Sequence, residues 1–495
     1  MSGFAEFDQY DGIGLAELVR RREVKPEEVL EAAIARVEAR NPAVNAVVSR
    51  LYDEARAAIR AGLPAGPFIG VPYLLKDLGA LYTGAITSFG SRLFADYRAD
   101  HDSEITARLK RAGLVIFGKT NTPELGLAPS TEPRLFGATR NPWNPSYSAG
   151  GSSGGAAAAV AAGMLPMAHA TDGGGSIRIP ASCCGLVGLK PTRARNPLGP
   201  DQGEGWGGAS VVHAVTRTVR DSAALLDATS GPDVGDPYWA PPPARPFLSE
   251  VGRAPGRLRI ALTTAPWNGQ PVDPECAEAA RAAATLCDKL GHRVEEARPE
   301  IDAPALGLAT RIIIGANIRA ALEARAAALG RELSAEDVER ATWELAADGR
   351  TNTAADYARA MGVVHRTGRI VARFFTDYDV LLSPTMCQPP YPLGVLDMMS
   401  QDGKAYLAAV LASVGFTSLF NSAGNPAISL PLAWSKAGLP LGVQFAAPFG
   451  DEATLFRLAA QFEAEAPWAD RRPALARAEA VPGAETVRAQ DALRL

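Results

Sequence analysis

Serines enclosed by glycines occur twice within a short stretch of this chain, and they are the residues best suited to chemistry. Ser152 lies in segment 149–155, AGGSSGG, and Ser176 ends segment 171–176, TDGGGS. Consecutive glycines lose backbone entropy on folding, so a packed protein keeps them where the chain turns tightly or approaches a ligand. Successive N–H groups in such a turn can hold an anion, and a serine beside them supplies a nucleophile for acyl transfer. The pattern favours a serine hydrolase over flexible linkers, because the alanine-rich segment 156–162 between the loops predicts a buried helix.

A serine nucleophile requires a base, and the usual base is histidine. The chain has five histidines, none of them near a G-x-S-x-G motif, and His169 lies between two alanines as a packed strand residue would. Lys76 is the stronger candidate because it follows the apolar run 71–75. Burial disfavours the ammonium form and lowers the pKa, which converts a lysine into a base near neutral pH. The alternative, a structural Lys76 paired with Asp77, stays open at this point.

Several buried strands and helices are predicted around these loops. Apolar runs predict strands at 68–75, which runs into Lys76, and at 114–117, 258–262 and 380–382. Helical spacing of apolar residues predicts helices around 15–19, 26–37, 273–290 and 303–350, with Pro26 in a first turn. Strands alternating with helices imply an α/β fold, with a large mixed sheet covered on both faces by helices.

The chain is predicted to form a single catalytic domain over residues 1–465. Within it we expect a helical segment at about 1–62 and a proline-rich surface excursion at about 231–257. The polar, proline-containing tail 466–495 is predicted to be loosely packed.

Composition narrows the possible partners. The chain has 495 residues, of which 47% are hydrophobic and 21% charged, and its net charge is −4. No run of Lys or Arg suggests binding of nucleic acid or of an anionic membrane, so a small molecule is the expected substrate. No apolar stretch is expected to reach the roughly 18–20 residues of a membrane span, and residues 1–10 lack a secretion signal. Five cysteines without a C-x-x-C pair give little support to metal binding, and a reducing cytoplasm is expected.

One motif is misleading. Residues 113–120, GLVIFGKT, match the phosphate-binding pattern G-x-x-x-x-G-K-[ST]. Their four central residues are β-branched, aliphatic or aromatic and predict a strand, and the Asn-Thr-Pro that follows does not begin a helix. Nucleotide binding by this segment is therefore not expected.

Taken together, these residues resemble the amidase signature family over roughly residues 10–465. The interval from Ser152 to Ser176 matches the pair of serines of that family. Stretch 169–192, which holds the second loop, is similar to the branch that contains 6-aminohexanoate cyclic-dimer hydrolases and aryl acylamidases. Further matching motifs are GVP at 70–72 with Lys76-Asp77, GKTNTPE at 118–124, NPWN at 141–144, GLKPT at 188–192, SPT at 383–385, NPA at 425–427 and GLPLGVQ at 438–444.

The resemblance implies a mechanism. Ser176 would attack a carbonyl carbon, and Ser152, on a cis peptide, would relay a proton between Ser176 and neutral Lys76. An acyl-enzyme would then be hydrolysed by water, with no metal and no organic cofactor. The N–H groups of Gly173, Gly174, Gly175 and Ser176 would form the oxyanion hole, and Ser153, Asp172 and Arg178 would hold the two loops together. Where the family usually has Thr or Ile, this chain has Gly173, which predicts a wider site.

The resemblance also implies an amide substrate, although the residues alone would permit an ester. We expect the pocket to be lined by segments 124–131, 311–320 and 387–420, with the Gly126 carbonyl and the Ser130 hydroxyl as candidate substrate contacts. Asn317 either binds substrate or is satisfied within its own helix. A homodimer is possible. Two other functions remain, a glutamine amidotransferase subunit that supplies ammonia to a partner and a non-catalytic scaffold.

Overall fold

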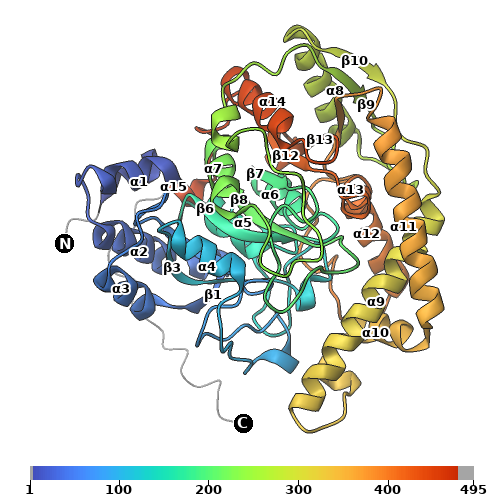
Figure 1. Cartoon of the computed structure of the whole chain (residues 1–495), viewed down its shortest axis with the longest axis horizontal. Coiled ribbons are helices and arrows are strands. Elements are labelled where there is room, and N and C mark those ends of the chain that lie inside the picture. The colour runs from blue at the N-terminus through green and yellow to red at the C-terminus, as the bar shows by residue number, and fades with distance from the viewer. Residues whose placement is uncertain (1–3, 478–495) are drawn as a thin grey trace.

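The computed structural model describes residues 4–477, and its centre is a mixed sheet of eight strands (Figure 1). Its strand order is β10-β9-β11-β13-β12-β7-β8-β6. The pairs β10/β9 and β9/β11 are parallel, and the other neighbours are antiparallel. The strands are β6 (Met167–Asp172), β7 (Val187–Lys190), β8 (Val211–Thr216), β9 (Arg259–Leu262), β10 (Arg293–Glu296), β11 (Val380–Pro384), β12 (Ala427–Trp434) and β13 (Pro440–Ala446). The expected large mixed sheet is confirmed.

A second sheet of three strands lies beside β6, at the edge of the large one. Its order is β1-β3-β2, with β1 (Val47–Arg50) antiparallel and β2 (Pro72–Lys76) parallel to β3 (Val115–Thr120). The backbone N–H of Lys76 donates to Nδ1 of His169 on β6 across 3.2 Å, so a side chain joins the two sheets at this point. The buried strand β3 covers most of segment 113–120, as predicted for the misleading phosphate-binding motif.

Both faces of the large sheet are buried. Alternate strand residues point to opposite sides, so the residues of one strand pack into two different apolar clusters. In β11, Val380 and Leu382 belong to one apolar cluster and Leu381 to another. The first cluster includes residues of α7 (Val219–Thr229), α8 (Pro274–Lys289) and α14 (Glu452–Glu465). The second includes residues of α9 (Ala303–Ala328), α11 (Ala354–Phe374) and α13 (Ser418–Ala423). Helices therefore cover the sheet on both sides, as expected.

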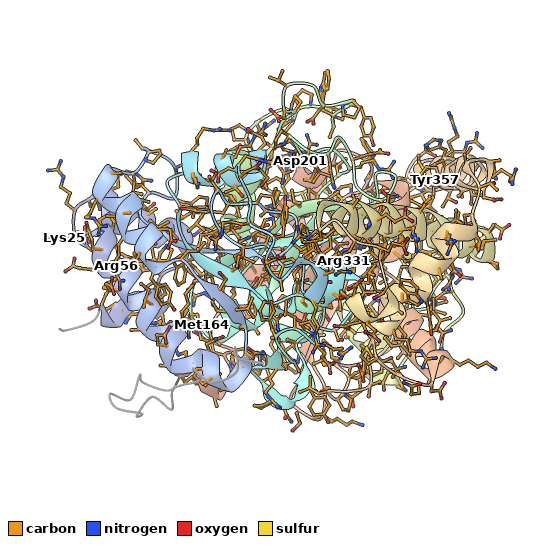
Figure 2. The ribbon with its side chains drawn as sticks, turned by 90° about the horizontal axis from the view of Figure 1, so that it is seen from below. Lys25, Arg56, Met164, Asp201, Arg331 and Tyr357 are labelled. Carbon is orange, nitrogen blue, oxygen red and sulfur yellow. The ribbon has the colours of Figure 1, made fainter. Side chains whose placement is uncertain are left out.

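The N-terminal helices and the helices α9–α11 form opposite ends of the molecule. Lys25 and Arg56 mark one end in Figure 2 and Tyr357 marks the other. The N-terminal part contains α1 (Gly12–Arg20), α2 (Pro26–Val44) and α3 (Tyr52–Ala61), and α2 begins at Pro26 as predicted. The remaining helices are α4 (Glu104–Arg111), α5 (Gly154–Ala161), α6 (Arg178–Cys184), α10 (Arg340–Thr351), α12 (Gly403–Val414) and α15 (Ala474–Arg477), and a two-stranded ribbon pairs β4 (Arg140–Asn141) with β5 (Asn144–Ser148).

Two predicted elements have different bounds in the structure. The strand expected at 68–75 begins only at Pro72, because Phe68 to Val71 form turns in which the N–H of Val71 donates to the Phe68 carbonyl. The helix expected over 303–350 is divided into α9 and α10. The first of these, α9, ends near Gly330, whose φ of 69° is a left-handed conformation that terminates helices.

The expectation that no apolar stretch reaches the length of a membrane span is wrong for α9. Among residues 4–477, α9 is the one helix both long and apolar enough, with a mean hydropathy of 1.4 in its 18-residue window, 33% of which is buried. Gly307 and Gly315 lie within this helix and do not interrupt it. Its buried side chains, including Leu306 and Ile313, pack in the same cluster as residues of α11.

The excursion at 231–257 is mostly exposed, but it is anchored by Phe247, which packs on Phe456 of α14 with ring centroids 5.7 Å apart.

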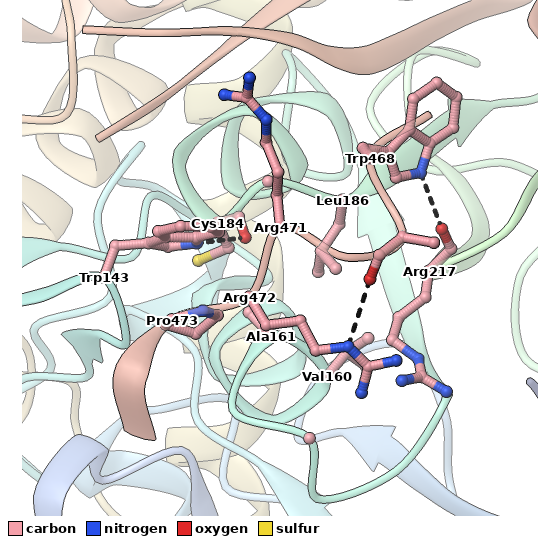
Figure 3. Close-up of a pocket in the computed structure, with 13 residues that line it drawn as sticks. Trp143, Val160, Ala161, Cys184, Leu186, Arg217, Trp468, Arg471, Arg472 and Pro473 are labelled. Carbon is pink, nitrogen blue, oxygen red and sulfur yellow. Dashed lines mark hydrogen bonds between the residues drawn. The ribbon is translucent and has the colours of Figure 1, made fainter. Parts of the chain in front are cut away.

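The tail was predicted to be loosely packed, and up to residue 477 the structure differs from this prediction. Trp468 is 4% exposed and its indole N–H donates to the Arg217 carbonyl (Figure 3). The Arg472 guanidinium donates to the Asp8 carbonyl. Residues 468–477 are therefore packed on the body, and the rest of the predicted tail lies outside the described residues.

We expect Trp468→Ala to lower the free energy of unfolding by about 3–5 kcal/mol, because it empties a buried site and removes a hydrogen bond. The change can be measured by thermal or denaturant unfolding followed by circular dichroism. Trp239→Ala is the matched control, since Trp239 is 59% exposed and its removal should change little. Equal stability of the two variants would contradict the packed position of Trp468.

Candidate active site

Lys76 ends β2 with its side chain fully buried. Its amine nitrogen Nζ lies 2.7 Å from Ser152 Oγ, 3.0 Å from Ser153 Oγ and 2.8 Å from Thr171 Oγ1. A neutral amine has two N–H donors and one lone pair, so three hydroxyl partners satisfy it completely. The arrangement suits a neutral lysine that donates two hydrogen bonds and accepts one.

Burial lowers the pKa of Lys76 well below its ordinary value, and the negative charge of Asp172 offsets this only in part. The carboxylates near Lys76 are engaged elsewhere. Asp77 accepts hydrogen bonds from the N–H and hydroxyl of Ser88, and it lies 3.7 Å from the Lys119 amine. The alternative in which Asp77 pairs with Lys76 is therefore not what the structure contains.

Ser152 and Ser153 lie immediately before α5, and the peptide bond between Gly151 and Ser152 is cis. The backbone packs so closely here that a Cβ on Gly151 would lie 2.2 Å from the Ser130 carbonyl oxygen. Only glycine fits this approach, which explains part of the glycine content of the first loop. The loop thereby brings Ser152 against Lys76.

Ser153 connects the two glycine-rich loops. Its N–H donates to the Ser176 carbonyl across 3.2 Å, and its hydroxyl donates to the Thr171 carbonyl, also across 3.2 Å. The same hydroxyl oxygen accepts from the Thr171 N–H and from Lys76. With its donor and acceptor positions used, Ser153 has a fixed orientation and holds the loops in register.

Asp172 and Arg178 have a different role from the one expected. Both are fully buried, and the guanidinium of Arg178 donates to both carboxylate oxygens of Asp172, at 2.9 and 3.0 Å. Burial by itself would raise the pKa of Asp172, but Arg178 and the Asn421 amide bring it below its ordinary value. Arg178 also donates to Asn421 Oδ1 and Gln444 Oε1, at 2.6 and 2.7 Å. The pair therefore ties the second loop to α13 and β13, and not to the first loop.

Asp172 also determines which backbone donors of the second loop are free. Its carboxylate accepts from the N–H of Gly175 at 2.7 Å and from that of Ile177 at 3.1 Å. Gly175 is thus occupied, which corrects its expected place in the oxyanion hole. Across residues 4–477, no acceptor pairs with the N–H groups of Gly173, Gly174 or Ser176, or with the Ser176 hydroxyl.

Gly173, Gly174 and Ser176 line a cavity of about 420 Å³. The three segments expected to form the pocket all contribute to it, through Leu127 and Pro129, through Arg311 and Ile313, and through Leu407 and Leu411. Most of the lining is apolar. Among the described residues that line the cavity, the one with a positively charged side chain is Arg311. It is half-exposed and pairs with Asp348 across 2.6 Å.

Of the three candidate substrate contacts, the structure brings only Gly126 to this cavity. Gly126 lies close to the Ser152 hydroxyl, since a Cβ there would be 3.2 Å from Ser152 Oγ. The Ser130 hydroxyl instead donates to the Leu396 carbonyl, and the Asn317 amide donates to the Ile313 carbonyl one helical turn earlier. Ser130 and Asn317 are therefore satisfied structural residues.

The expectation that Gly173 widens the site is also wrong. A Cβ on Gly173 would lie 2.6 Å from the ring of Trp206, so the indole fills the space that a larger residue would occupy. Trp206 lines the cavity and was not identified from the sequence. Its neighbours Gly205, Gly207 and Gly208 repeat the glycine-rich pattern of the catalytic loops, and this was the available signal.

Four other contributors were missed. Thr171 contacts the lysine amine, and Thr417, Asn421 and Gln444 bind Arg178. Gln444 belongs to one of the motifs that carried the family resemblance, whereas nothing local distinguishes Asn421. His169 is a packed strand residue as predicted, and burial lowers its pKa to about 3, so it is neutral near pH 7.

Comparison with known proteins agrees with this geometry. Residues 28–456 match the protein family described as Amidase. The chain belongs to the amidase family. This amidase is 42% identical over 481 residues to the 6-aminohexanoate-cyclic-dimer hydrolase of Paenarthrobacter ureafaciens, covering 94% of this chain and 96% of the relative. It is 36% identical over 468 residues to an acylamidase of Rhodococcus erythropolis, covering 93% and 96% of the two chains.

A solved structure of 6-aminohexanoate cyclic dimer hydrolase superimposes with a TM-score of 0.90 at 42% identity, covering 94% of this amidase and 99% of that chain. The fold and the family membership predicted from the motifs are therefore confirmed, and the amidase is a hydrolase. The catalytic roles of individual residues are a separate question.

We expect Arg178→Met to lower the free energy of unfolding of this amidase by about 3–5 kcal/mol, because it leaves the Asp172 carboxylate buried without its cation. Arg359→Met is the matched control, since Arg359 is exposed and pairs with Asp356 at the surface, where an ion pair contributes about 0–1 kcal/mol. Denaturant unfolding of both variants measures the difference. If Arg178→Met were as stable as its control, the buried pair would not have the role described.

Proposed function

We propose that this amidase cleaves the C–N bond of a small, uncharged and largely apolar amide through Ser176, Ser152 and Lys76. The observation that carries the proposal is the fully buried Lys76 amine at 2.7 Å from Ser152 Oγ. Next to it, the Ser176 hydroxyl and three N–H groups without a partner in the described chain border a cavity. Groups that can act as a base, a relay, a nucleophile and oxyanion donors thus lie close together, which supports the proposal.

In the proposed reaction, the Ser176 oxygen bonds to the carbonyl carbon while its proton passes to Ser152, whose own proton passes to the Lys76 lone pair. The carbonyl oxygen becomes an oxyanion and accepts hydrogen bonds from the N–H groups of Gly173, Gly174 and Ser176. The C–N bond then breaks, and the nitrogen leaves with the proton returned from Lys76 through Ser152. Water repeats the sequence on the acyl-enzyme and releases the acid.

One of the two contacts that the proposed relay requires supports it. Ser152 contacts Lys76, whereas no hydrogen bond joins the Ser152 and Ser176 hydroxyls. Catalytic hydrogen bonds are often long or poorly aligned in the free enzyme and tighten in the substrate complex, so this geometry is compatible with the relay.

The cavity favours an uncharged substrate with alkyl or aryl groups. Its volume of about 420 Å³ is within the range of small-molecule sites, and its lining is mostly apolar. The substrate classes we propose are cyclic amides built of methylene chains, linear amides, anilides and carbamates. The first of these is supported by the 42% identity to a cyclic-dimer hydrolase, and the second and third by the similarity to an acylamidase.

We expect Ser176→Ala to reduce hydrolysis by on the order of 10⁴-fold or more while the fold is retained, because the nucleophile is lost. Lys76→Ala and Ser152→Ala should also be severely impaired. The assay is a panel of short fatty amides, anilides, amino-acid amides, cyclic lactam dimers, carbamates and glutamine, with products separated by chromatography. A fluorophosphonate probe should label Ser176, which mass spectrometry can locate.

Ser249→Ala is the control, because Ser249 is an exposed serine that only caps a turn. Near-normal turnover by Ser176→Ala would falsify the assignment, and labelling at another residue would identify a different nucleophile. Ammonia release from glutamine only in the presence of a partner protein would instead favour an amidotransferase subunit. A folded wild-type chain that neither hydrolyses the panel nor reacts with the probe would indicate a scaffold.

We expect kcat/KM to fall as the pH is lowered and to level off on the alkaline side. The proposed reaction requires neutral Lys76, and burial holds its pKa well below the ordinary value, so the neutral form persists to a lower pH than in an exposed lysine and is lost as pH falls through that pKa. The profile is measured with initial rates, and circular dichroism at each pH tests whether the fold persists. Lys76→Arg should be inactive throughout, because arginine stays charged. An acid limb that coincides with unfolding would remove the support for Lys76 as the base.

A further inference from the structure

The indole of Trp206 is in direct contact with the loop that carries Ser176. A Cβ built on Gly173 would lie 2.6 Å from Cζ3 and 2.7 Å from Cε3 of Trp206, closer than carbon atoms approach without displacement. Residue 173 therefore has to be glycine while Trp206 keeps this position. The wall of the cavity above the oxyanion donors is the edge of an aromatic ring from a remote segment of the chain.

The position of Trp206 is fixed by its own loop. The residue has a φ of 53°, and the loop is closed by a hydrogen bond of 3.1 Å from the Ser210 N–H to the Gly205 carbonyl. The Arg193 guanidinium donates to the Gly208 carbonyl across 2.6 Å. At Gly207 a Cβ would lie 2.7 Å from Met361 Sδ, so the loop also packs tightly against α11.

Apolar residues support the ring from two sides. Trp206 packs against a cluster that contains Ile313 of α9 and Val364 of α11, and against a second cluster that contains Leu125 and Ile318. Both clusters belong to the elements that surround the cavity, and Ile313 and Val364 line it together with Trp206. The ring is therefore packed against both clusters and forms part of the cavity wall.

The proposed reaction determines which part of the substrate meets this wall. A carbonyl carbon bonded to Ser176 Oγ has three other directions. Its oxygen points to the N–H groups of the Gly173 loop, and its nitrogen points to Ser152, beside Gly126 and Gly151. The third direction is that of the acyl group. A Cβ on Gly173 would meet Trp206, whereas a Cβ on Gly126 would meet Ser152 Oγ and Leu78 instead. On this basis the ring is assigned to the acyl group and not to the leaving group.

We propose that Trp206, seated on Gly173, is a specificity-determining residue that limits the width of the acyl group next to the scissile bond. This inference rests on the proposed function. A narrow, unbranched acyl chain fits beside the indole edge, whereas a carbonyl carrying a branched or aryl substituent meets the ring. Gly173 and Trp206 act as a pair. A larger residue at 173 would collide with the indole, and a smaller residue at 206 would leave space beside Gly173.

The test compares two series of anilides in wild type and in Trp206→Ala. The first series keeps aniline as the leaving group and changes the acyl group from butyryl to pivaloyl and benzoyl. The second keeps butyryl and changes the aniline from unsubstituted to ortho-alkylated. We expect Trp206→Ala to raise the ratio of kcat/KM for pivaloyl over butyryl by about tenfold or more, the discrimination expected for one or two methyl groups in a pocket. The ratios within the leaving-group series should stay unchanged.

A second pair of variants tests the contact itself. Gly173→Ala should lower kcat/KM for every anilide, because its Cβ displaces the indole or the oxyanion loop. In Gly173→Ala/Trp206→Ala the space for that Cβ is restored, so kcat/KM should recover by about tenfold relative to Gly173→Ala, a coupling typical of residues in direct contact. Trp239→Ala, a tryptophan exposed on the 231–257 excursion, is the control that should leave all ratios at the wild-type values.

Each outcome decides the inference. A purely structural role of Trp206 would lower kcat for all anilides equally and leave the acyl ratio unchanged, and that result would overturn it. A change confined to the leaving-group series would overturn it as well. If Trp206→Ala fails to fold, Trp206→Leu and Trp206→Phe provide graded ring removal, and the acyl ratio should increase with the volume removed. If wild type hydrolyses anilides but does not prefer butyryl over pivaloyl and benzoyl, this inference alone is refuted. If wild type hydrolyses no amide, the proposed function and the inference are refuted together.

Discussion

The proposed active site depends on keeping one buried amine, Lys76, away from any free carboxylate. A desolvated lysine remains neutral only if no unpaired negative charge lies close to it, because such a charge favours the ammonium form. Two aspartates lie near Lys76 in the fold, and each has its own cation. Arg178 binds Asp172 through two hydrogen bonds, and Lys119 lies 3.7 Å from Asp77. The partners left to Lys76 are three uncharged hydroxyls.

This requirement explains why distant parts of the chain converge on the catalytic loops. Arg178 is fully buried, and a buried guanidinium needs acceptors for its remaining N–H groups. They come from Thr417, Asn421 and Gln444, more than two hundred residues further along the chain. Asn421 in turn donates to the Asp172 carboxylate across 2.8 Å. The C-terminal strands and helices therefore help to keep the pKa of Lys76 low, although the proposed reaction takes no atom from them.

The sequence was sufficient for features whose signal is local. Lys76 follows a buried apolar strand, and Ser152 and Ser176 lie in glycine-rich loops, so their neighbours indicate their environment. Features that depend on contacts between distant segments could not be predicted. Gly173 suggested an open site because Trp206, which fills the space, belongs to another loop. Asn317 looked available because its partner is a backbone carbonyl one turn earlier in its own helix, which leaves no trace in residue types.

The burial that lowers the pKa of Lys76 also favours an uncharged substrate. In a low-dielectric site the free N–H groups of the second loop act more strongly on an oxyanion than they would in water. A carboxylate on the substrate close to the scissile bond would counteract both effects, because it would compete for those donors and raise the pKa of Lys76 through Ser152. An ammonium group would have no acceptor in the apolar part of the lining. A ring of methylene groups joined by amides carries neither charge, and each of its acyl chains is unbranched next to the carbonyl. Under the proposed roles of Lys76 and Trp206, such a molecule would therefore meet the electrostatic and the steric requirement at once, whereas an amino-acid amide, charged and branched beside the carbonyl, would meet neither.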